Sequence, residues 1–104
     1  MAPPNFQRRL LAVMRAGGLI KSDLRVWFNR PWATVRTWVE HGHEPTGPMG
    51  EVAYESLALL EAAVEDKRWF PIPRELSWLD RRRHVELARK DIDRAQIFPT
   101  RATK

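Results

Sequence analysis

Cysteine is absent from this chain of 104 residues. Without thiols, neither a disulfide framework nor a thiolate metal site can form, and this absence agrees with a cytoplasmic protein. The longest apolar runs fall far short of the roughly 20 residues that a membrane-spanning helix needs. No signal peptide is evident, because prolines and arginines precede only a short apolar stretch at the N-terminus. We therefore expect a cytoplasmic protein without disulfides or contact with a membrane.

The sequence also lacks the common motifs of enzyme active sites. It has no glycine-rich phosphate loop with a lysine, no paired metal-ligand motif and no nucleophile elbow. Asp91 and Asp93 would point away from each other on a helix, so we interpret them as solvated charges. His41 and His43 lie in a predicted loop without an obvious third ligand, which is typical of surface residues. We expect a protein that is not an enzyme and holds no metal or other cofactor.

Positive charge is in excess, and its distribution divides the chain into three segments. The net charge is +5, which favours an anionic partner, nucleic acid first. Residues 1–43 are predominantly basic, whereas residues 44–66 contain acidic side chains and no Lys or Arg. The chain then becomes basic again and includes the run Arg81–Arg83. We expect the acidic segment to avoid DNA, and acidic and basic helices to pair within the chain or between copies.

Residues 21–41 have the pattern of two short helices joined by a tight turn. In the first helix, predicted over residues 22–28, Ser22 is a suitable N-cap. Leu24 and Phe28 then fall on one face. Asn29 follows at the turn, and asparagine is one of the few residues besides glycine that accept a positive φ.

The second helix of this pair is predicted over residues 31–41. Pro31 suits its first turn, because the proline φ is already helical and the missing N–H would have no partner there. Val35, Trp38 and Val39 then form one apolar face. The polar side chains of this helix are left on its outer surface.

This pattern resembles the helix-turn-helix of phage and bacterial DNA-binding proteins. Asn29 stands where glycine is commoner, and Arg30 stands where a buried aliphatic residue is usual. A buried arginine without a partner is costly, so either Arg30 turns outward to a phosphate or the turn is built differently. A helical pair in any small bundle can show the same spacing. The residues that carry the resemblance are Leu24, Phe28, Asn29, Thr34, Val35 and Trp38.

The resemblance implies a DNA-binding surface on the two short helices. Trp27 and Trp32 are ambiguous, because large aromatic residues in so small a unit more often belong to the core. If Trp32 is exposed at the start of its helix, it can instead contact a thymine methyl group or a sugar. The predicted DNA contacts are Lys21, Ser22, Arg25, Arg30, Trp32, Ala33, Arg36 and Thr37.

A further helix precedes the motif. Asn5 can cap a helix over residues 5–16, and Gly17 and Gly18 provide its stop. Three helices would then form a trihelical DNA-binding unit within residues 1–43. Residues 44–50, rich in glycine and proline, are predicted to be a linker.

The second half of the chain is predicted to be a helical hairpin over residues 51–96. Residues 51–66 have apolar positions in alternating steps of three and four, as in the seam of a coiled coil. Ser77 can cap another helix that runs to about residue 96. Residues 97–104 lose periodicity and are predicted to be a flexible tail. The expected fold class is therefore all-α, with a helix-turn-helix unit followed by a hairpin.

This order of segments resembles the layout of the terminase small subunits of tailed phages, although the chain is short for that family. The resemblance implies recognition of viral double-stranded DNA for packaging, a homo-oligomeric ring, and a tail that engages the large ATPase/nuclease subunit in the cytoplasm of a bacterial host. A small helix-turn-helix transcriptional regulator or an excisionase-like protein is an alternative. An assembly adaptor that does not bind DNA is another. For the terminase-like ring, the resemblance implies that the oligomer is held together by Leu57, Leu60, Val64, Val85 and Ile92.

Overall fold

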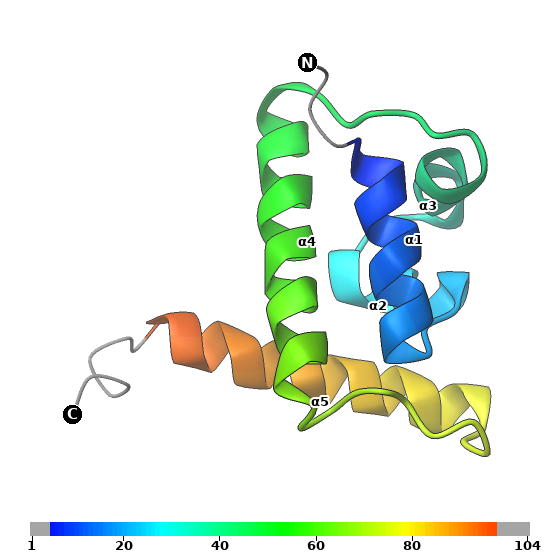
Figure 1. The fold of residues 1–104 in the computed structure, drawn as a ribbon, viewed down its shortest axis with the longest axis vertical. Helices are drawn as coiled ribbons and strands as arrows, with labels where there is room; N and C mark the ends of the chain where they lie inside the picture. Colours follow the sequence, from blue (N-terminus) through cyan, green and yellow to red (C-terminus); the bar gives the residue numbers. More distant parts are fainter. Residues whose placement is uncertain (1–4, 98–104) are drawn as a thin grey trace.

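Five helices make up the part of the chain that the structure, a computed structural model, describes. It describes the backbone of residues 5–97 and the side chains of residues 5–94. The helices are α1 (Phe6–Gly17), α2 (Lys21–Phe28), α3 (Trp32–Glu40), α4 (Gly47–Asp66) and α5 (Trp78–Ile97) (Figure 1). Residues 5–97 contain no strand, so the all-α prediction is confirmed. The predicted tail lies outside the described residues except for Ile97, which ends α5.

The two ends of α1 form as their residues predict. The side chain of Asn5 caps the helix, because its Oδ1 accepts a hydrogen bond from the Arg8 N–H at 2.6 Å. At the other end Gly18 has φ 63°, in the left-handed region that glycine adopts without a steric penalty. The N–H of Leu19 then donates to the carbonyl of Met14 at 2.8 Å, which closes the helix.

The start of α2 differs from the prediction. The helix begins at Lys21, so Ser22 lies inside it and is not the N-cap. The carboxylate of Asp23 accepts a hydrogen bond from the Ile20 N–H at 2.8 Å and so satisfies a backbone donor at the helix start. At the other end Asn29 has φ 54°, which confirms the predicted left-handed turn before α3.

The predicted linker over residues 44–50 is partly wrong, because α4 already begins at Gly47. Pro48 lies in the first turn, where a missing N–H costs no hydrogen bond. Gly50 is buried, and a Cβ at this position would lie 2.7 Å from the carbonyl oxygen of Pro45. The glycines and prolines therefore allow the chain to turn closely into a helix instead of separating two domains.

Aromatic side chains fill the centre of the N-terminal unit. Phe6 of α1 makes edge-to-face contacts with Phe28 of α2, Trp38 of α3 and Tyr54 of α4. The ring centroids of Phe6 and Trp38 lie 5.0 Å apart. Trp27 is also buried, and its indole N–H donates to the Ser56 carbonyl at 2.9 Å. These contacts confirm Trp27 as a core residue and join α4 to the first three helices.

The order of the predicted architecture is confirmed, since an N-terminal three-helix unit precedes a second pair of helices. In Figure 1, α5 crosses the C-terminal end of α4 and lies below α2. The larger packing surface of α5 is with α2, and its contact with α4 is smaller. The connection between α4 and α5 contributes Phe70 and Ile72 to the core. The second pair is therefore continuous with the core of the first unit.

A buried ion pair fixes α5 on α2. Arg81 Nη2 lies 2.5 Å from Asp23 Oδ2, and the two side chains are only 12% and 3% exposed. The same guanidinium donates to the carbonyl of Gly18 at 2.9 Å. Arg81 thus joins α5 to the start of α2 and the end of α1 at a single point.

Replacing Arg81 by Ala should lower the free energy of unfolding by about 3 kcal/mol, because it leaves the buried carboxylate of Asp23 without its cation. Urea unfolding followed by circular dichroism measures this loss. Arg83→Ala is the control, since Arg83 is exposed on the same helix and should change stability by less than about 0.5 kcal/mol. Equal stabilities of the two variants would show that the pair contributes nothing.

The residues predicted to hold an oligomer lie in the core of the single chain. Leu57, Leu60 and Val85 have no exposed surface, and Val64 is also buried. Ile92 is partly buried and packs against the same core. The apolar seam of residues 51–66 is therefore covered by α1, α2 and α5 of its own chain.

Leu60→Ala should lower the free energy of unfolding by about 2 to 5 kcal/mol, because it opens a cavity in a packed core. The native mass of the folded protein should not change. Urea unfolding measures the first quantity and light scattering after size exclusion measures the second. A lower native mass with little loss of stability would instead place Leu60 in an interface between copies.

Candidate nucleic-acid interface

The outer surface of α2 and α3 carries the residues predicted to contact DNA. α3 turns Val35 and Trp38 inward, where both are buried. The opposite face of the helix is thereby presented to solvent. The exposed members of the predicted set are Ser22, Arg25, Trp32, Ala33 and Arg36, and the half-exposed members are Lys21, Arg30 and Thr37.

The side chain of Lys21, at the start of α2, reaches Trp32, the first residue of α3. Trp32 is 41% exposed, and its ring centroid is 5.6 Å from Lys21 Nζ. This distance allows a cation–π contact between the two helices. Trp32 is therefore a surface residue on the candidate interface, unlike the buried Trp27.

The middle of α3 presents short side chains and one arginine. The Thr37 hydroxyl donates to the Ala33 carbonyl at 2.7 Å, so it lies close to the helix surface. Arg36 is exposed and lies four residues, about one turn, from each end of α3. A helix face of this kind can approach the base edges in a major groove, because small side chains permit close contact and arginine supplies two parallel donors.

Glu40 lies between two of the predicted cations. Its carboxylate accepts a hydrogen bond from Lys21 Nζ, and its Oε1 lies 3.5 Å from Arg36 Nε. The hydrogen bond from Lys21 lowers the pKa of Glu40 below its usual value, and the positive charge of Arg36 lowers it further. The prediction from sequence missed this role, although the spacing of Arg36 and Glu40 by one helical turn indicated it.

Glu40→Gln should tighten duplex binding by roughly 2- to 10-fold at low salt, because it releases Lys21 and Arg36 and removes one negative charge from the interface. Fluorescence anisotropy with a labelled duplex measures the change. Glu65→Gln makes the same change of charge at an exposed position of α4 and is the control. Equal affinities of the two variants would place Glu40 outside the interface.

Because the folded pKa of Glu40 is depressed, its contribution to stability is present above the ordinary carboxyl pKa and is lost as the pH falls through the lowered value.

The turn between α2 and α3 places Arg30 outside the core. The side chain is half-exposed, and its Nη2 lies 3.3 Å from the sulfur of Met49. Arg30 therefore does not occupy the buried position that an aliphatic residue usually fills in a helix-turn-helix. Of the two alternatives that the sequence left open, the structure shows an arginine turned outward, where its guanidinium is accessible to an anion.

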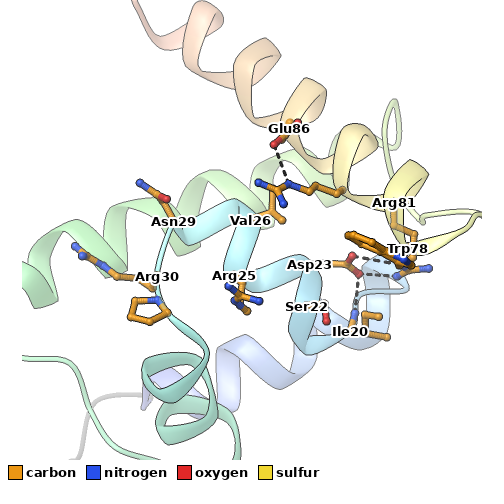
Figure 2. A pocket seen from close by; sticks show the side chains of 12 residues that line it. Ile20, Ser22, Asp23, Arg25, Val26, Asn29, Arg30, Trp78, Arg81 and Glu86 are labelled. Carbon is orange, nitrogen blue, oxygen red and sulfur yellow. Dashed lines mark hydrogen bonds and ion pairs between the residues drawn. The ribbon is translucent and has the colours of Figure 1, made fainter.

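A groove of about 550 Å³ lies between α2 and the first half of α5 (Figure 2). α2 and the turn line one side with Ser22, Arg25 and Arg30. α5 lines the other side with Trp78 and Arg82. The prediction from sequence did not include α5 in the site, because the only local signal there was the basic run Arg81–Arg83.

Within residues 5–94, no group of three or more His, Asp or Glu side chains is placed to hold a metal ion. None of the helices in residues 5–97 is both long and apolar enough to cross a membrane.

No protein-family model matches the chain, and no curated protein or solved structure matches it. The geometry and charge of the surface formed by α2, α3 and α5 are therefore the observations that bear on function.

Proposed function

We propose that this protein binds double-stranded DNA through α2, the turn at Asn29 and α3. The observation that supports this proposal best is the arrangement of α3, which is held by an aromatic core on one face and presents Ala33, Arg36 and Thr37 on the other. A helix held in this way can enter a major groove without changing its own packing. The net charge of +5 adds attraction to the phosphate backbone.

The residues of this surface divide by reach and chemistry. Arg36 is assigned to base edges, where a guanidinium can donate two bonds to guanine. Trp32 and Ala33 are assigned to apolar contact with thymine methyl groups or sugars. The contacts assigned to phosphates, which position the protein but do not read sequence, are Lys21, Ser22, Arg25 and Arg30.

Arg36→Ala should abolish most of the preference for the best duplex, because a bidentate arginine contributes about 1 to 3 kcal/mol of discrimination. The preferred duplex is first selected from a random library, and its affinity is then compared with that of a scrambled duplex. Arg15→Ala is the control, because Arg15 is exposed on α1 and carries the same charge. If the parent and both variants bind all duplexes equally weakly, and salt abolishes every complex, α3 does not read bases.

For the biological role, we propose recognition of viral DNA for genome packaging, as in a terminase small subunit that assembles and engages a large ATPase/nuclease subunit. The order of a helix-turn-helix unit followed by a second helical pair supports this role. A ring would need an interface outside the core, and exposed apolar side chains are available on α4 at Met49 and Val52 and on α5 at Leu79 and Leu87.

A small transcriptional regulator or an excisionase-like protein is the second candidate. The observation that favours it is the burial of Leu57, Leu60 and Val85 within a single chain, since such a protein needs only a monomer or a dimer. The native mass at physiological salt, with and without the selected duplex, distinguishes the two roles. A closed ring of many copies supports packaging, and a monomer or dimer supports regulation. A protein that binds no duplex but retains an oligomeric mass would instead be an assembly adaptor.

A further inference from the structure

We infer that the groove between α2 and α5 holds a phosphodiester backbone of the same duplex that α3 reads, so that Trp78 and Arg82 of α5 belong to the DNA interface. This inference rests on the proposed function and extends it. None of the local patterns that indicated a helix-turn-helix includes α5. The groove, its charge and its exposed tryptophan are the observations that support it.

The groove continues directly from the proposed recognition surface. Its lining includes Asn29, Arg30 and Pro31, the residues that connect α2 to α3. It extends from there along α2 to Ser22 and is bounded on the other side by α5 (Figure 2). In helix-turn-helix complexes the first helix of the motif crosses the DNA backbone. A backbone strand that passes α2 while α3 lies in the groove of the DNA would therefore adjoin α5.

The charge of the groove matches a polyanion. Four arginines line it, Arg25, Arg30, Arg81 and Arg82, together with the carboxylates of Asp23 and Glu86. Arg81 and Asp23 form the buried pair and cancel each other. The remaining three arginines face one carboxylate, so the accessible part of the groove is positive.

Arg82 is available to a phosphate. Its side chain is 59% exposed, and its Nε lies 3.3 Å from Glu86 Oε2 on the next turn of α5. An exposed pair of this kind contributes little to stability. A phosphate can therefore replace Glu86 as the partner of the Arg82 guanidinium at small cost, and arginine pairs with phosphate in a bidentate manner.

Trp78 supplies an apolar surface beside these charges. It is 72% exposed, the largest exposed fraction among the exposed large hydrophobic residues of the described chain. Its ring forms part of the groove lining next to Arg81 and Arg82. An indole at the edge of a basic groove can pack on a deoxyribose while the arginines contact the flanking phosphates. This combination fits a sugar–phosphate backbone better than it fits an isolated anion.

The test compares Arg82→Ala with Arg83→Ala, which removes the same charge from the adjacent exposed residue of α5, outside the groove. The affinity for the selected duplex is measured across a series of salt concentrations. Arg82→Ala should lower the slope of log K against log salt by about 1, the loss of one phosphate contact, and leave the preference between duplexes unchanged. Arg83→Ala should lower the slope by less than half as much.

Two further variants act in opposite directions. Trp78→Ala should weaken binding by roughly 5-fold or more without changing the salt slope, because it removes an apolar contact and no charge. Glu86→Gln should tighten binding and steepen the slope, because it frees Arg82. The four substituted positions of α5 are all exposed, and unchanged thermal unfolding confirms that each variant is folded; they are Trp78, Arg82, Arg83 and Glu86.

Failure of this inference is distinguishable from failure of the proposed function. If Arg82→Ala and Arg83→Ala behave alike and Trp78→Ala binds as the parent does, while Arg36→Ala still loses its preference, the groove is outside the interface and α3 still reads DNA. If Arg36→Ala also has no effect, the proposed function fails. If the parent binds a single strand of the selected sequence more tightly than the duplex, and Arg82→Ala removes that binding, the groove holds a single strand and the same-duplex inference is overturned.

Discussion

The position of α5 depends on the buried pair between Asp23 and Arg81. The carboxylate also accepts the Ile20 N–H, and the guanidinium also reaches the Gly18 carbonyl. One ion pair therefore joins the end of α1, the start of α2 and the start of α5. α5 has a narrow apolar stripe, in which Val85 and Ala88 are the fully buried side chains among residues 78–94. A helix with so little buried apolar surface needs a directional interaction to fix its orientation, and a buried charge pair supplies it because separation of the charges is costly.

The ion pair between Asp23 and Arg81 also shapes the candidate interface. Because Arg81 is anchored at the start of α2, the neighbouring Trp78 and Arg82 are held opposite Ser22 and Arg25 across a groove. The aromatic cluster around Phe6 independently orients α3, with Trp38 inside and Arg36 outside. The proposed base-reading helix and the proposed backbone groove are thus oriented by two different sets of contacts.

Predictions from local patterns succeeded where one residue or one turn of helix decides the conformation. The cap at Asn5, the left-handed residues Gly18 and Asn29 and the exposed face of α3 follow from properties of the residues themselves. Three local predictions were wrong. Pro31 is the extended N-cap of α3, which begins at Trp32, and not a residue of its first turn. Asp23 took the capping role expected of Ser22, and residues 47–50 formed the first turn of α4, with Pro48 at its start and Gly50 packed closely on Pro45.

The sequence by itself determined the all-α class, the turn at Asn29 and the outward face of α3 that carries Arg36, since caps, φ preferences and helical periodicity act over a few residues. Only the tertiary structure decided which apolar faces meet. The seam of residues 51–66 has the same pattern whether it packs in its own chain or against a copy, and here it is covered by α1, α2 and α5. Likewise, Asp23 and Arg81 are 58 residues apart, and no local pattern indicates that they pair. Contacts at such separations depend on how all the helices pack together, and for that reason the groove between α2 and α5 emerged from the structure alone.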